Sequence, residues 1–148
     1  MPVQVTDDIE AAARAYLRGD TAEYNQRIAE LGRARETTVA FRAMVYAAFL
    51  LTVQYKFSKD TPREEIIDFV AEIRSRSDDL PDTIDPTAAE RQITSVFTGE
   101  NTDDVDTRME LTIQMLFATA IVDDQGIEGQ LFEQLMTSTR KLADDLLS

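Results

Sequence analysis

The sequence predicts an all-α protein, a compact helical bundle of about six helices that forms a single domain over residues 1–148. Three observations support this fold class. Apolar residues recur at helical spacing, as in Ile66, Phe69, Val70 and Ile73. Capping residues precede the apolar segments, and only five Gly and four Pro interrupt 148 residues. A chain of this length with 43% hydrophobic residues can bury a core without disulfides or metal ions.

The expected helices follow one another with short connections. They span residues 7–18, 21–57 with a break near Gly32, 62–77, 87–97, 104–122 and 127–147. Four of the starts are indicated by a side-chain oxygen that stands three residues before a Glu, namely at Asp7, Asp20, Thr61 and Thr87. Residues 77–86, with two prolines and four aspartates, are the expected connector between two halves of the chain.

The most apolar stretch covers residues 39–53 and carries Arg42. It is shorter than the roughly 20 apolar residues that a membrane-spanning helix needs. We therefore expect a buried central helix here and no membrane partner. We also predict that the helices at 36–57 and 104–122 meet at the centre of the molecule.

The chain resembles itself at an offset of 66 residues. Ten of the sixty pairs between residues 21–80 and 87–146 are identical, including Arg42 with Arg108, and the apolar positions keep their bulk in the same register. We interpret these segments as two tandem three-helix units related by a pseudo-twofold axis. Two amphipathic hairpins in accidental register are the alternative interpretation.

Composition excludes the commonest catalytic sites. The chain has no Cys and no His, which removes Ser-His-Asp triads, Cys-His pairs, thiolate metal sites and His-rich zinc sites. Any enzyme would have to work with carboxylates, Arg, Lys or Tyr alone. We therefore expect a non-enzymatic protein with no cofactor. The first six residues lack the basic start and apolar run of a signal peptide, so a cytoplasmic location is expected.

The net charge of −13 is distributed unevenly along the chain. Residues 1–77 carry eleven basic and twelve acidic side chains, a net of −1, whereas residues 78–148 carry four basic and sixteen acidic ones, a net of −12. A field of this sign repels phosphate backbones and anionic lipid surfaces. No nucleic-acid partner is expected.

Two acidic runs, at residues 99–106 and 123–128, collect oxygen ligands of the kind that Ca²⁺ and Mg²⁺ prefer. Neither run has the spacing of an EF-hand loop. Both precede helices, where carboxylates cap free N–H groups and favour the positive end of the helix dipole. We expect them to be caps, with no metal site.

The segment from Asp123 to Glu133 resembles the acidic Asp-Gly interhelical turn of TerB-like tellurite-resistance domains, which are also helical with internal pseudo-symmetry. In this sequence Gln125 separates Asp124 from the glycine, and no matching acidic turn stands at Lys59 in the first half. We therefore assign no family.

Five polar residues near the predicted centre are the candidate ligand-binding residues: Arg42, Tyr46, Gln54, Arg108 and Gln114. Arg42 and Arg108 stand at matching places near the starts of the two apolar helices. A buried guanidinium is costly unless a carboxylate and further acceptors meet it. Each arginine is therefore either an anchor for an anionic or other ligand, or an interhelical ion-pair partner.

The leading functional hypothesis is a protein interaction module, an adaptor or regulator that binds another protein, a second copy of this chain included, through an exposed helix face. It rests on aromatic and Met side chains beyond what a small core needs: Phe41, Tyr46, Phe49, Tyr55, Phe57 and Met136. The alternative is a small-molecule pocket between the two halves, lined by the five polar candidates. A third hypothesis is an acidic mimic of nucleic acid, which would need carboxylates at phosphate spacing along one face.

Overall fold

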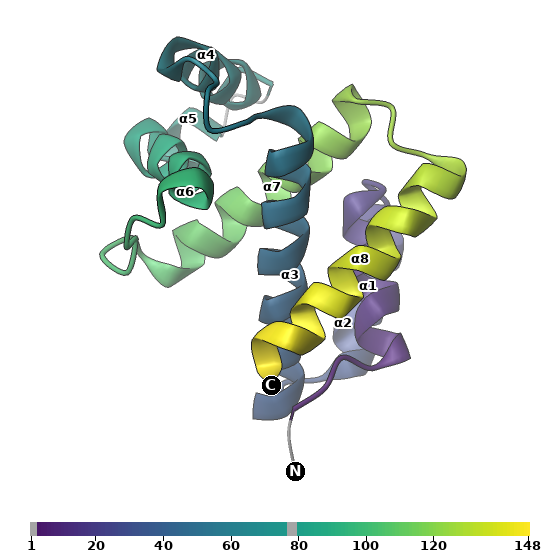
Figure 1. The fold of residues 1–148 in the computed structure, drawn as a ribbon. Coiled ribbons are helices and arrows are strands. Elements are labelled where there is room, and N and C mark those ends of the chain that lie inside the picture. Colours follow the sequence, from purple (N-terminus) through teal and green to yellow (C-terminus); the bar gives the residue numbers. More distant parts are fainter. Residues whose placement is uncertain (1–2, 77–79) are drawn as a thin grey trace.

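The computed structural model describes residues 3–76 and 80–148, and these residues form seven longer helices, one single-turn helix and no strand. The all-α fold class is thus confirmed. The helices are α1 (Asp7–Leu17), α2 (Thr21–Leu31), α3 (Arg35–Lys56), α4 (Arg63–Arg74), α5 (Leu80–Thr83), α6 (Pro86–Thr98), α7 (Thr107–Asp124) and α8 (Gly129–Leu147) (Figure 1). The count exceeds six because the second expected helix divides at Gly32 and the connector contains the turn α5.

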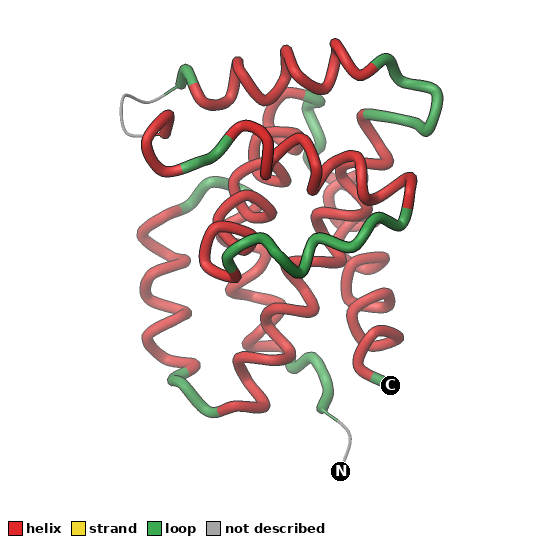
Figure 2. The backbone as a smooth tube through the Cα atoms, turned by 90° about the vertical axis from the view of Figure 1, so that its left-hand side faces the viewer, coloured by secondary structure: helices red, strands yellow, loops and turns green. Residues whose placement is uncertain are grey.

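α3 and α7 cross at the centre of the molecule, as predicted, and the other helices are arranged around them (Figure 1). α8 lies along α3 on one side, next to the hairpin of α1 and α2, while α4 and α6 pack together on the other. Figure 2 shows that the last residues of α8 lie at the same end of the molecule as the beginning of the described chain. A bond from the Val5 backbone N–H to Asp144 Oδ1, 3.1 Å long, joins these two segments.

By length and composition, α3 is apolar enough to cross a membrane, with a mean hydropathy of 1.3 over its most apolar window. In this fold half of that window is buried against other helices. Met44, Val45, Ala47 and Ala48 on α3 are fully buried. The apolar side chains of α3 therefore form part of the buried centre of the bundle.

The core consists of two hydrophobic clusters that share α3 and α7. The alanine-rich cluster joins α1 and α8 to the first part of α3, and seven of its members are alanines: Ala12, Ala13, Ala40, Ala47, Ala48, Ala118 and Ala143. The Phe/Ile cluster joins α4 and α6 to the end of α3 and to α7. Its large members are Phe49, Phe57, Ile66, Phe69, Ile73, Ile84, Ile93, Ile113, Phe117 and Ile121.

Several of the predicted capping residues differ from those observed at the helix starts. Asp20 does cap α2, because its carboxylate accepts a 3.1 Å bond from the Glu23 N–H. Thr6 caps α1 in place of Asp7. Thr61 Oγ1 accepts from the Ser58 N–H instead, at 2.8 Å, and α4 begins two residues later at Arg63. α6 likewise begins one residue before Thr87, at Pro86.

The order of helices repeats along the chain, since the offset of 66 residues places α2, α3 and α4 on α6, α7 and α8. Their contacts differ between the two units: α8 packs along α3, whereas α4 packs against α6. Ser77, Asp78 and Asp79, which begin the predicted connector and include two of the repeated positions, lie outside the described residues.

Candidate functional site

An open groove of about 320 Å³ lies between the first half of α3, the start of α7 and the end of α8. Two helices contribute residues at positions i, i+3, i+4 and i+7, which share one helix face. The walls are formed by Val39, Arg42, Ala43 and Tyr46 on α3, by Thr107, Glu110, Leu111 and Gln114 on α7, and by Leu146 and Leu147 on α8.

The groove gathers apolar side chains that the core leaves exposed. Val39 is 38% exposed, Tyr46 41% and Leu146 47%, and these are three of the six large hydrophobic residues that are exposed in the described part of the chain. Exposed apolar residues scattered singly are ordinary on protein surfaces, whereas a concentration of them marks an interaction site. The groove is such a concentration.

A short polar network lies against the apolar walls. Gln114 Nε2 donates to Glu110 Oε1 at 3.3 Å and to Gln92 Oε1 at 3.4 Å, which links the groove to the buried contact between α6 and α7. Burial raises the pKa of Glu110, and this effect opposes the hydrogen bond from Gln114 and the positive charge of Arg42, which lower it. Glu110 is therefore a partly dehydrated carboxylate at which a cation would be favoured.

Three of the five predicted site residues, Arg42, Tyr46 and Gln114, come together in this groove. Gln54 is exposed and lies eight residues beyond Tyr46, about 12 Å along the same helix at 1.5 Å per residue. Arg108 is exposed beside the groove, off the face that carries the α7 wall residues. The five residues do not form one site.

The expected ion pairs of the two matching arginines are not found among the described residues, because Arg42 and Arg108 are exposed and need no buried counter-ion. The other seven groove residues, Glu110, Val39 and Leu146 among them, were not predicted from the sequence. Glu110 stands four residues before Gln114 on the same helix, and this spacing is the signal that would have identified it.

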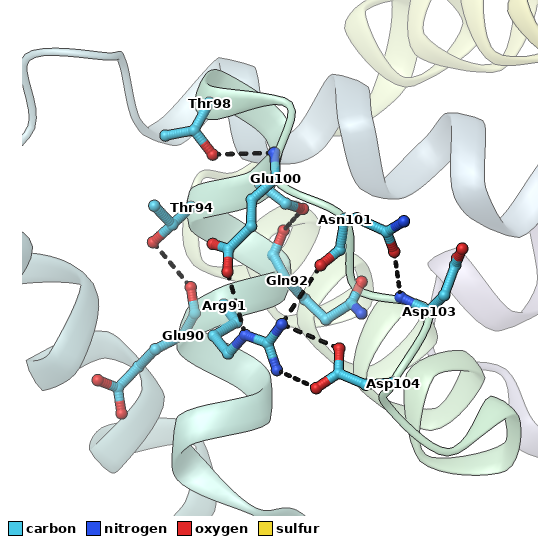
Figure 3. Close-up of polar contacts among 10 residues, drawn as sticks. Glu90, Arg91, Gln92, Thr94, Thr98, Glu100, Asn101, Asp103 and Asp104 are labelled. Carbon is cyan, nitrogen blue, oxygen red and sulfur yellow. Dashed lines mark hydrogen bonds and ion pairs between the residues drawn. The ribbon is translucent and has the colours of Figure 1, made fainter.

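The acidic run at 99–106 folds around an arginine (Figure 3). The Arg91 guanidinium donates to both carboxylate oxygens of Asp104, at 2.8 and 3.0 Å, and to the Asn101 carbonyl at 3.3 Å, and it pairs with Glu100 at 3.5 Å. The hydrogen bond from Arg91 holds the pKa of Asp104 below its ordinary value. These contacts fix the connection that positions the start of α7.

Two further acidic residues of these runs are used in a similar way. Asp106 caps α7, with its carboxylate accepting from the Met109 N–H at 3.1 Å. In the second run, Asp124 accepts a 2.7 Å bond from Arg76. In residues 3–76 and 80–148, no group of three or more Asp, Glu, His or Cys side chains is placed to hold a metal ion. The first run therefore supplies a cap and ion pairs, as predicted, whereas the second supplies an ion pair and Glu128 makes no side-chain cap at the start of α8.

Comparisons of the chain with protein-family models, with curated proteins and with solved structures find no match. The resemblance of residues 123–133 to the TerB-like turn is accordingly supported by no match over the whole chain. The site must be interpreted from its own geometry and charge.

Proposed function

We propose that this chain is a protein interaction module that binds an apolar, positively charged segment of another protein in the groove between α3, α7 and α8. The observation that carries the proposal is the concentration of Val39, Tyr46 and Leu146 in one open groove beside a partly buried carboxylate. Apolar anchors surrounded by polar groups are the usual composition of a binding surface for a protein.

The charge around the groove favours a basic partner. Two of its three walls come from the half of the chain with a net charge of −12. Asp106 is exposed at the start of α7, Glu110 lies in the wall, and Asp145 is exposed one residue before Leu146. Arg42 and Arg108 only partly offset these carboxylates. Complementary charge of this kind speeds association and selects partners more than it increases affinity.

Site-specific photo-cross-linking tests the proposal with a control on the same helix. A photoreactive phenylalanine analogue replaces Tyr46 in one variant of the full chain and Tyr55 in the other. Both tyrosines are exposed on α3, but Tyr55 lies outside the groove. In the native host, position 46 should give a covalent adduct whose cross-linked segment, located by mass spectrometry, contains Lys or Arg among apolar residues. Position 55 should not give this adduct.

A second variant tests the apolar contact. Leu146→Asp should abolish the adduct at position 46 while leaving the circular dichroism spectrum unchanged, because Leu146 is an exposed residue in the last turn of α8. Three outcomes would each contradict the proposal: the same adduct from both positions, no adduct at position 46, or a cross-linked segment without basic residues. An adduct of twice the chain mass would show that a second copy fills the groove, and size-exclusion chromatography with light scattering would then measure that dimer.

A further inference from the structure

The walls of the groove between α3, α7 and α8 present side chains to a partner and almost no free backbone groups. The α3 wall runs from Val39 to Tyr46, and the α7 wall runs from Thr107 to Gln114. Both stretches are helical, so apart from the first N–H groups of α7 their backbone groups bond within their own helix. The described residues form no strand, and no sheet edge therefore borders the groove.

This construction limits the conformation of a partner segment. A segment that joins a sheet edge gains main-chain hydrogen bonds, but an extended segment in this groove would press some peptide groups against Val39, Ala43 and Leu146. A buried N–H or C=O group without a partner costs free energy. An α-helix satisfies these groups internally and offers only its side chains. The walls therefore favour a helical partner segment.

The groove also has the dimensions of a helix-packing site. The ends of each wall, 39–46 and 107–114, are seven residues apart, which corresponds to about 10 Å or roughly two helical turns. Side chains at i, i+3, i+4 and i+7 form the ridges between which the side chains of another helix pack. In Figure 1 the space to the left of the first half of α3, below the start of α7 and next to the end of α8, holds no helix of the described chain.

The last turn of α8 provides a position for a cation at this site. Leu146 and Leu147 of the groove wall lie in that turn, where backbone C=O groups lack intrahelical N–H partners and form the negative end of the helix dipole. The turn contains no basic side chain to offset this charge. Glu110 adds a carboxylate on the α7 wall of the same groove. A Lys or Arg of the partner would be attracted by both.

We infer that the segment bound in the groove is an amphipathic α-helix. Two turns of its apolar face, spaced i, i+3 or i+4, and i+7, pack against Val39, Tyr46 and Leu146, and a Lys or Arg beside that face meets Glu110 and the end of α8. This inference rests on the proposed function of the groove, to which it adds the conformation and the residue spacing of the partner.

Two synthetic peptides of identical composition test the helical conformation. Each has about 18 residues, enough for a helix to form, with Leu at helical spacing, Lys beside the Leu face, one Pro and a fluorescein label. One peptide has Pro as its first helical residue, where a helix tolerates it, and the other has Pro in the central turn, where it interrupts the helix. Fluorescence anisotropy should show saturable binding of the first peptide to the full chain. The second should bind about 100-fold more weakly, because of the cost of an interior Pro.

Variants of the full chain show where the first peptide binds. Leu146→Asp should weaken its binding at least about tenfold through the lost apolar contact and the added charge in the groove wall. Ile67→Asp makes the same kind of change at an exposed residue of α4 outside the groove and should leave the dissociation constant unchanged. Glu110→Gln should weaken binding about threefold to tenfold, because it removes the carboxylate that attracts the Lys side chain.

The outcomes separate the inference from the proposed function on which it rests. If both peptides bind equally well and Leu146→Asp weakens both, the helical partner is overturned and the groove remains a binding site for an apolar, basic segment. If neither peptide binds, or if Leu146→Asp weakens the first peptide no more than Ile67→Asp does, both the inference and the proposed function are overturned.

Discussion

In the alanine-rich cluster, α1 and α3 contribute small side chains such as Ala12 and Ala48, together with Phe132 and Met136 of α8. In the Phe/Ile cluster, α4 and α7 both contribute large side chains, such as Phe69 and Phe117. Small side chains let helix backbones approach closely, and large ones hold the backbones apart while filling the space between them. Helices with the same place in the sequence repeat, α8 and α4, both bring large side chains to the core, but the cluster that α8 joins contains more alanines. The difference shows that a repeated order of helices does not require a repeated core.

The contacts that join the helices also differ between the two clusters. Across the alanine-rich cluster, α1 and α8 are joined by the ion pair of Arg14 with Glu133 and by Arg140, which contacts Asp7 at 2.7 Å and Glu10 at 3.2 Å. At the Phe/Ile cluster, aromatic contacts continue through the core, since the Phe69 ring lies 5.5 Å from both Phe57 and Phe117. Charged pairs therefore join α1 to α8 beside the first cluster, and ring packing joins α4 to α7 within the second.

The largest effect is expected from truncating the Phe/Ile cluster. Phe117 is fully buried on α7 and meets Phe69 edge to face. Phe117→Ala should lower the free energy of unfolding by about 3–5 kcal/mol, through lost burial and a residual cavity. Urea titration followed by circular dichroism measures this loss. A loss below about 1 kcal/mol would mean that the cluster refills the space and that its large side chains are not essential.

An intermediate effect is expected from enlarging a residue of the alanine-rich cluster. Ala48 is fully buried on α3, so Ala48→Leu should lower the free energy of unfolding by about 1–3 kcal/mol through overpacking. Ala29→Leu on the exposed surface of α2 is the matched control, and its effect should stay within about 0.5 kcal/mol. If Ala48→Leu is as well tolerated as the control, the two clusters do not differ in how closely their helices approach.

The smallest effects concern two glutamates with pKa shifts of opposite sign. The hydrogen bond from Arg14 lowers the pKa of Glu133, so this residue stabilises the fold at neutral pH and loses that contribution as the pH falls through its folded-state pKa. Burial raises the pKa of Glu110, so the stability that its protonated form supplies at low pH is lost as the pH rises through the folded-state pKa.

The corresponding variants should therefore differ in sign. At neutral pH, Glu133→Gln should lower the urea midpoint and Glu110→Gln should raise it. Both differences should shrink near about pH 3, below the ordinary carboxyl pKa values. Urea titrations at the two pH values test this. If the two variants shift the urea midpoint in the same direction at neutral pH, then either Glu133 makes no stabilising contact or Glu110 does not cost stability at its place in the groove.

Much of the fold follows from local sequence signals. The predicted break near Gly32 is confirmed, because its φ of 76° lies in the region that only glycine adopts readily. The failures also have local causes. Thr61 fits a capping pattern, but its hydroxyl is used by the turn that begins at Ser58. The single turn α5 was not predicted, because four residues are too few to show a helical period.

The candidate site was predictable only in part. Arg42 and Tyr46 share one face of α3, and Gln114 faces them from α7, which the predicted crossing of these helices placed nearby. The contribution of Leu146 depends on the direction in which α8 crosses α3, and nothing in the local sequence specifies that direction. The 3.0 Å bond from Thr119 Oγ1 to the Tyr16 carbonyl likewise depends on how the hairpin of α1 and α2 lies against α7, a relation between residues about 100 positions apart.

α3 contributes residues to both clusters, with Ala40 to Ala48 in one and Phe49 and Val53 in the other. Neither half of the repeat therefore contains all the residues of a complete core. Residues 3–76 alone would lose α7 and α8, which make the most extensive contacts with α3, and residues 80–148 alone would lose α3 itself. The two segments therefore form one cooperative unit, and neither is expected to fold without the other.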